Sequence, residues 1–274
     1  MEEYTKRDLS YESDALHAFL GVLNSWSTLV DAVGCNAQQY RAHIWGLAIH
    51  GSWLNLGWHH EQPTLRRAGF PSWSWVGWQG PVNIWRSRYP EITFSVEVSY
   101  SSSSEIVSGL THPDAMAESW VPLDKYFHDL QSMQRTTKSA LRLLKITGPC
   151  PRLRLFQYNY ENCQALIPAT IDRSIRCTVD WDDSTIQYSE YGSCIAIMIE
   201  TGLDKTHPSP RSSPGIYASG GQFLLLMPTS NKGVYKRVGR MSTSWLPISP
   251  DYSVGTPHDP WEEPFCEERT VLLE

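Results

Sequence analysis

The sequence lacks the features that define several large classes of protein. No apolar run approaches the roughly 20 residues that a membrane-spanning helix needs, and the first 14 residues, MEEYTKRDLSYESD, are polar and acidic, unlike a secretory signal. Basic residues are the minority, with 23 Lys and Arg against 29 Asp and Glu and a net charge of −6. A dedicated nucleic-acid binder would carry a basic stripe instead. We therefore expect a cytoplasmic protein that binds neither membranes nor nucleic acid.

Cysteine is sparse, and no Cys-x-x-Cys pair occurs. Small disulfide scaffolds contain far more cysteine, and structural zinc sites need ligands close together in sequence. We interpret the cysteines as mostly buried thiols in a reducing cytosol, although one or two disulfides stay possible on spacing alone. The six are Cys35, Cys150, Cys163, Cys177, Cys194 and Cys266.

Motifs of nucleotide binding and of common hydrolases are missing as well. The chain has no Gly-x-Ser-x-Gly elbow, no phosphate-binding loop and no dinucleotide-binding fingerprint. Serine and histidine are plentiful, but no pattern orders them into a triad. The sequence thus predicts no cofactor and favours a non-catalytic protein over an enzyme.

Two polar clusters could carry chemistry. His59-His60-Glu61 follows His43 and His50, which are seven residues apart and could share a helix face. A metal site needs three or four converging donors, and no second close pair of ligands supports one here. We therefore expect no metal and interpret these histidines as surface or half-buried side chains beside a polar loop.

The second cluster is acidic. Asp180, Asp182 and Asp183 could hold Ca²⁺ or share a proton. They lie where a strand should turn, and Asp is a common turn residue. We favour the turn.

Hydrophobic periodicity divides the chain into a helical beginning and a β-rich remainder. Residues 13–33 place apolar side chains on one face at helical spacing, and residues 38–58 predict a shorter or broken helix weakened by glycines. The period then changes to two. The sequence predicts an α+β fold, with residues 1–68 packed on an antiparallel β-sandwich or distorted barrel of residues 69–274 that begins with a Trp-rich strand. Strands are predicted over 92–99, 139–147, 152–158, 175–181, 193–200, 222–227, 233–241 and 268–273.

Tryptophan is concentrated in one segment, GFPSWSWVGWQGP at residues 69–81. Its members Trp73, Trp75 and Trp78, with Trp53, His59 and His60 nearby in sequence, could line a site for a flat aromatic or apolar ligand. Large aromatic side chains also dominate buried area, so the same residues could fill a seam between the helical part and the sheet. The seam is the favoured interpretation, and the ligand platform is the alternative.

This segment also carries a family resemblance. GFPSWSWVGWQGPV resembles the PSWSWAGWxGxV signature found downstream of the HET domain in fungal heterokaryon-incompatibility proteins. YTKRDLSYESDALHAFLGVL at residues 4–23 is similar to the segment that closes the HET domain in that family, with His17 where the family usually has Asn. GVYKRVGRM and ERTVLLE resemble its closing strands, so the resemblance covers nearly the whole chain.

The resemblance implies where the chain lies in such a protein. The HET domain would precede these segments, so no functional residue of that domain has a counterpart here. The family is tied to a cell-death response when unlike strains fuse, which implies a regulatory or recognition role in self/non-self signalling. The alternative is an enzyme or binding protein for a small apolar or aromatic metabolite. We expect residues 1–30 to contact a partner, either a HET domain or a second copy of the chain.

Overall fold

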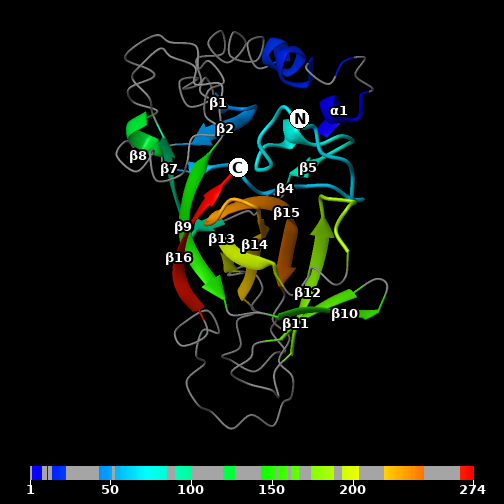
Figure 1. Ribbon diagram of the computed structural model, residues 1–274, viewed down its shortest axis with the longest axis vertical. Coiled ribbons are helices and arrows are strands. Elements are labelled where there is room, and N and C mark those ends of the chain that lie inside the picture. Colours follow the sequence, from blue (N-terminus) through cyan, green and yellow to red (C-terminus); the bar gives the residue numbers. More distant parts are fainter. Residues whose placement is uncertain are drawn as a thin grey trace, which may run out of the picture.

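The computed structural model shows an α+β protein in which strands far outnumber helices (Figure 1). No described helix is long and apolar enough to cross a membrane. The structure describes residues 2–7, 11, 14–22, 43–50, 53–84, 90–99, 120–126, 143–151, 154–159, 162–166, 174–187, 193–203, 219–243 and 266–274. The segments SSSSE, HPSPRSSPG and PISPDYSVGTPHDP, whose Ser, Pro and Gly content predicts loops, lie outside these residues.

One large, almost entirely antiparallel sheet forms the body of the protein. Its main path runs β10-β11-β12-β15-β16-β9-β7-β8, while β14 pairs with both β15 and β13, and β13 pairs with β6. The only parallel pairing among these described strands joins the start of β15 to the end of β16. The strands are β6 (Pro90–Ile92), β7 (Ser95–Ser99), β8 (Trp120–Pro122), β9 (Leu144–Pro151), β10 (Arg154–Asn159), β11 (Asn162–Leu166), β12 (Ser174–Trp181), β13 (Ile195–Leu203), β14 (Ser219–Pro228), β15 (Val234–Thr243) and β16 (Cys266–Leu273).

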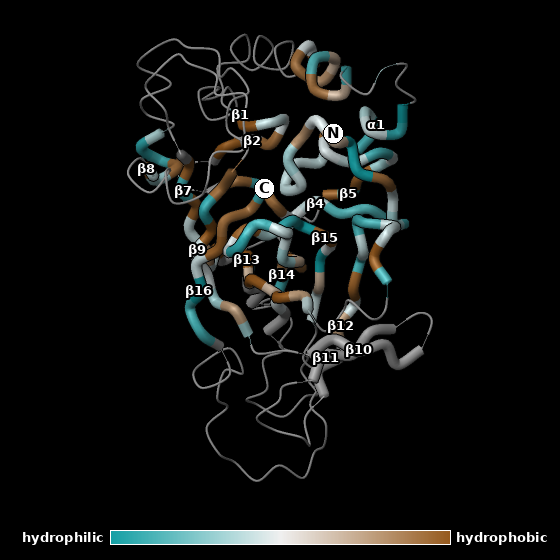
Figure 2. Tube along the Cα trace, in the orientation of Figure 1, coloured by the Kyte–Doolittle hydropathy of each residue, from teal (hydrophilic) through white to brown (hydrophobic). Residues whose placement is uncertain are grey.

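The central strands β13 and β14 are apolar on both faces because a separate core lies on each side of them. Successive side chains of a strand point to opposite faces. Ile197 and Leu224 accordingly belong to the larger core, while their neighbours Met198 and Phe223 belong to the smaller one. All four are at most 1% exposed, and the hydropathy view shows the brown central strands (Figure 2). The continuous apolar runs CIAIMIE and FLLLM predict strands that are buried on both faces, and the structure confirms this.

The sheet curves so that β13 lies against β9 without pairing with it. Gly148 on β9 allows this approach, because a Cβ there would lie 3.3 Å from the Met198 carbonyl oxygen and 3.0 Å from the Phe94 side chain. Strand β15 also changes partners along its length. Val234 and Tyr235 pair with β16, whereas Gly239 to Thr243 pair with β12.

A smaller layer sits above this sheet and contains the N-terminal residues and the Trp-rich segment (Figure 1). Helical residues are α1 (Glu2–Thr5) and 14–22, the described part of the predicted helix 13–33. Short strands β1 (His43–Ile44), β2 (Leu47–His50) and β3 (Trp53–Leu54) make one sheet, and β4 (Trp58–His59) pairs with β5 (Asn83–Ile84). Residues 120–126 form β8 followed by helical residues 123–126, and the rest of the short helix predicted around 123–133 lies outside the described residues.

The predicted helix over residues 38–58 is wrong: the described part, from His43 onward, forms strands. Trp45 and Gly46 both have positive φ, at 49° and 79°, which is the pattern of a type I′ hairpin turn. This turn joins β1 to β2, with Ile44 paired to Leu47. Gly46 therefore marks a reversal of the chain where we expected a weak point in a helix.

The strand predictions agree with the structure more closely than the helix prediction over 38–58. All eight predicted segments overlap an observed strand, with ends displaced by at most five residues. The sequence analysis missed β11, which lies at Asn162–Leu166 and pairs antiparallel with both β10 and β12. Its sequence, NCQAL, contains no β-branched or aromatic residue, the types that are enriched in strands.

Gly239 allows β15 to approach β12 closely, so we predict that Gly239→Ala destabilises the protein. A Cβ at this position would lie 2.6 Å from the Asp180 carbonyl oxygen and 3.2 Å from the Trp181 Cα. Because backbone cannot yield as a side-chain end does, we expect a loss of about 1–3 kcal/mol in the free energy of unfolding, measured in urea. Gly69→Ala is the control, since no atom lies within 4 Å of its added Cβ. Equal urea midpoints for the two variants would contradict the prediction.

Candidate functional site

The Trp-rich segment is not the strand that the sequence predicted. Trp75–Gly77 form a 3₁₀ helix, η2, that begins after Ser74, whose Oγ accepts a hydrogen bond from the Val76 N–H at 3.2 Å. Gly77 is required for this tight turn, because a Cβ there would lie 2.3 Å from the Pro71 carbonyl oxygen. Alternation therefore does not apply here, and the tryptophans point in different directions.

The tryptophans of the segment Pro71–Trp78, named here the tryptophan joint, are buried. Trp73, Trp75 and Trp78 are 0%, 2% and 1% exposed. The indole N–H of Trp75 donates to the Gly46 carbonyl at 3.2 Å, and that of Trp78 to the Ser72 carbonyl at 2.8 Å. The Trp73 carbonyl accepts from the indole N–H of Trp58 on β4 at 3.1 Å. Buried indoles need such partners, and these partners hold parts of the fold together.

The two serines of the joint bind other segments. Ser74 Oγ donates to the Trp45 carbonyl at 2.6 Å, so Ser74 and Trp75 together fix the β1–β2 turn. Ser72 Oγ accepts from the Arg237 backbone N–H at 2.9 Å and donates to the Glu274 carbonyl. Ser72 thus attaches the joint to β15 and to the segment after β16. Each residue from Ser72 to Trp75 contacts a segment that is distant in sequence.

Trp75 also receives the N-terminal residues. Tyr4 and Phe19 pack on its ring with centroid separations of 5.9 and 4.9 Å, both nearly edge-to-face, and on each other at 5.2 Å. The Tyr4 hydroxyl donates to the Ala15 carbonyl at 3.0 Å, which links α1 to residues 14–22. These three aromatic side chains form the contact between the N-terminal helices and the joint.

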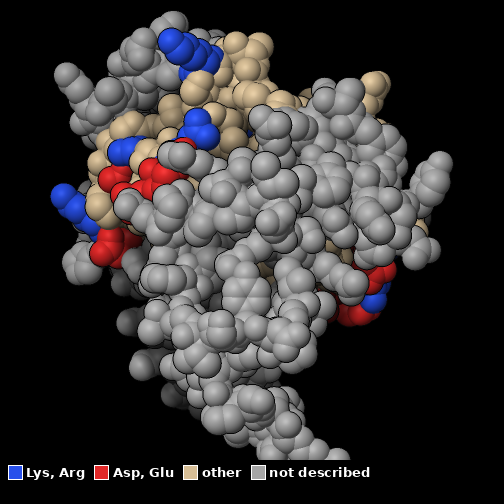
Figure 3. Space-filling model, turned by 90° about the horizontal axis from the view of Figure 1, so that it is seen from below, with Lys and Arg blue, Asp and Glu red and all other residues tan. Residues whose placement is uncertain are grey.

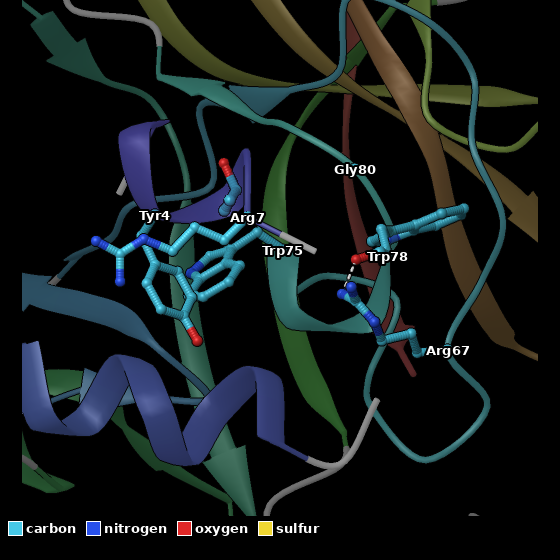
Figure 4. Close-up of a pocket in the computed structure, with 7 residues that line it drawn as sticks. Tyr4, Arg7, Arg67, Trp75, Trp78 and Gly80 are labelled. Carbon is cyan, nitrogen blue, oxygen red and sulfur yellow. Dashed lines mark hydrogen bonds between the residues drawn. The ribbon is translucent and has the colours of Figure 1, made fainter. Parts of the chain in front are cut away.

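A hollow lies beside this contact, lined by Tyr4, Arg7, Arg67, Trp75 and Trp78, with Thr5 and Gly80 (Figure 4). The space open to the centre of a water-sized molecule is about 10 Å³, enough for roughly one water. Within the lining of this hollow, the Arg67 guanidinium donates a hydrogen bond to the Trp78 carbonyl. An aromatic metabolite does not fit a space of this size.

Arg237 on β15 lies beneath the joint and is wholly buried. Its Nε donates to Asp182 at 2.8 Å, one terminal nitrogen donates to the Leu56 carbonyl at 2.8 Å, and the other donates to the Trp58 carbonyl. The guanidinium also stacks on the Trp58 ring, 3.5 Å from its centroid. An isolated buried charge is very costly, whereas this one is paired and hydrogen-bonded on every nitrogen.

The three clustered aspartates are each paired with a cation of β15. Asp180 binds Arg240 at 2.7 Å, Asp182 binds Arg237 at 2.8 Å and Asp183 binds Lys236 at 3.1 Å. The cationic partners of the aspartates are the basic residues of VYKRVGRM. The sequence alone does not show that they are partners, because the pairing depends on the register that places β12 beside β15.

The predicted turn is confirmed for Asp182 and Asp183, whereas Asp180 lies within β12. Residues 182–185 leave β12, and Asp183 accepts from the backbone N–H and hydroxyl of Thr185 at 2.9 and 2.6 Å. Burial raises the pKa of Asp183, but the hydrogen bonds from Thr185 and Lys236 outweigh it and lower the pKa below 3.8. The carboxylate is therefore ionised near neutral pH.

The histidines do not converge. His43 and His50 lie on β1 and β2, not on one helix face, and His59 is half-buried on β4. His60 is 2% exposed, so its interpretation as a surface or half-buried side chain is wrong. Among the described residues, no three His, Cys, Asp or Glu side chains come close enough to hold a metal ion.

Trp53 is also a residue of the predicted site. The backbone of Trp53 lies in β3, but its side chain is outside the described part of the structure. In the view of Figure 3, the visible acidic side chains of described residues lie near basic ones, while one basic group at the top of the view stands apart. No family model, curated protein or solved structure matches the chain. The resemblance to heterokaryon-incompatibility proteins therefore stays a prediction.

If the joint is structural, Trp73→Ala must destabilise the fold. Truncating a wholly buried tryptophan leaves a cavity, so we expect a loss of about 3–5 kcal/mol in the free energy of unfolding. Leu65→Ala, at a 53% exposed side chain, should change it by less than about 0.5 kcal/mol. Chemical unfolding followed by circular dichroism measures both. A Trp73→Ala variant that unfolds with the parent would argue for a ligand platform.

Proposed function

We propose that the chain is a non-catalytic, HET-associated domain with a regulatory or recognition role in fungal self/non-self signalling. The proposal rests on the burial and the hydrogen bonds of the tryptophan joint. Its tryptophans are buried and the polar groups of Ser72, Ser74 and Trp75 bind the chain's own backbone. The segment that resembles the family signature therefore acts as a structural connection.

The alternative, an enzyme or binding protein for a small apolar or aromatic metabolite, has less support. Binding sites for such ligands have a cavity of several hundred Å³ and a few polar groups that point into it. The hollow beside α1 has room for about one water, and the three indole N–H groups of Trp58, Trp75 and Trp78 are used inside the fold.

The N-terminal residues support a partner-binding role, but over a smaller surface than the predicted residues 1–30. Tyr4, Leu16 and Phe19, which we considered as possible contacts to a partner, are at most 9% exposed. Tyr11 and Val22 instead are 69% and 43% exposed. We assign the contact to this remaining apolar surface, with a HET domain as its partner and a second copy of the chain as the other possibility.

Such a contact would be linked to the rest of the fold. Tyr4 and Phe19 pack directly on Trp75, and the joint is bonded to β15 through Ser72. A HET domain that binds or shifts residues 2–22 would therefore change the packing of Trp75. This gives the domain a physical route for sensing the state of its neighbour.

The test is binding of a HET domain from a family member, added in trans. We expect amide hydrogen exchange in residues 2–22 to slow on binding. Tyr11→Asp and Val22→Asp should weaken binding about tenfold or more, since a charge at a contact centre is poorly tolerated. Leu65→Asp is the matched control, because Leu65 is also an exposed apolar side chain but lies in another segment.

Two outcomes would count against the proposal. Residues 2–22 could be as protected as β14 from the start and unaffected by a HET domain, which removes the partner surface. Alternatively, mass spectrometry could find a metabolite that co-purifies with the parent and is lost from a Trp75→Phe variant that still folds. That result would favour the metabolite-binding alternative.

A further inference from the structure

His60 is a buried titratable side chain in the wall of the tryptophan joint. It lies between two tryptophans, with ring centroids 5.7 Å from Trp58 and 6.5 Å from Trp78. Its Nδ1 is 2.8 Å from the Pro81 carbonyl oxygen. Because a carbonyl can only accept, Nδ1 carries the hydrogen and Nε2 holds the lone pair. Nε2 is buried and has no hydrogen-bond partner among the described residues.

The charged groups around His60 compensate an added proton only in part. Asp182, in the turn after β12, Arg237 on β15 and Arg67 in the loop after β4 are the charged groups that act on the ring. Asp182 already binds the Arg237 guanidinium through Oδ2 and the His60 backbone N–H through Oδ1, at 3.2 Å. A proton on Nε2 would thus place a second positive charge beside a wholly buried arginine.

We propose that His60 makes the tryptophan joint an acid-sensitive latch, closed while the imidazole is neutral and opened when it is protonated. A buried imidazolium needs an acceptor or water at Nε2. Water can reach that atom if the flanking Trp58 and Trp78 rings separate. Trp78 follows directly after η2, so this separation also loosens Trp75 and the N-terminal residues that pack on it. This device is a property of the fold and does not depend on the proposed partner.

The direction of the pH dependence follows from the burial. Burial is the largest effect and lowers the pKa of His60 below 6.5; Asp182 and the Pro81 carbonyl oppose it, and Arg237 and Arg67 add smaller effects in the direction of burial. In the unfolded chain the imidazole keeps its ordinary pKa, so the unfolded state binds more protons below pH 6.5. The stability that neutral His60 provides is therefore complete above pH 6.5 and is lost as the pH falls below it.

The first experiment compares the parent with His60→Asn. The asparagine amide nitrogen can still donate to the Pro81 carbonyl, but the side chain takes up no proton in this range. In urea, the unfolding constant of the parent should rise between pH 6.5 and 5 by up to about tenfold per pH unit more than that of the variant. His17→Asn is the control, because His17 is exposed on helix 14–22, and it should follow the parent. The comparison with the variant also removes the background from His43 and His59, whose pKa values burial lowers as well.

A second measurement uses the parent alone and holds even if His60→Asn folds poorly. Nuclear magnetic resonance should find that the His60 ring stays neutral below pH 6.5. Amide exchange at residues 58–60 and 73–78 should accelerate on acidification before that of β14. A His60 ring that titrates near pH 6.5 with no change in the tryptophan signals would overturn the proposal. Equal pH dependence of the parent and His60→Asn would do the same.

Discussion

The buried guanidinium of Arg237 is the constraint on which the upper layer of the protein depends. Each of its three nitrogens needs a hydrogen-bond acceptor. The acceptors are the Asp182 carboxylate in the turn after β12 and the Leu56 and Trp58 carbonyls. The Trp58 ring covers the guanidinium and its N–H holds Trp73. The tryptophan joint, the β12 turn and β15 are therefore parts of one polar network. Removing any acceptor would leave a buried charge without compensation.

Much of the sheet could be predicted because its signals are local. Alternating residues mark one face of β7, and the continuous apolar runs of β13 and β14 follow from a core on each side. The turn at Asp182 and Asp183 also follows from local preference, since short acidic side chains bind their own backbone. Within the candidate site, the burial of Trp73 and Trp75 as a seam was favoured because bulky aromatics supply most buried area.

The rest depended on contacts between distant segments. The 43–58 region has enough apolar residues for a helix, yet Ser74 and Trp75 hold Trp45 and Gly46 in a turn from 29 residues away. His60 and Arg237 look like surface residues in sequence. Asp182 binds the His60 backbone N–H and the Arg237 side chain from 122 and 55 residues away, and no local pattern indicates such partners.

The most direct test of this account is the stability of Arg237→Lys. Lysine keeps the positive charge but has one compact ammonium group, so it cannot reach Asp182, Leu56 and Trp58 together. The account predicts a loss of about 2–5 kcal/mol in the free energy of unfolding, measured by urea denaturation. Lys236→Arg, at a neighbouring side chain that is 30% exposed, should stay within about 0.5 kcal/mol of the parent. An Arg237→Lys variant as stable as the parent would show that the guanidinium network does not hold the joint, and would contradict the account.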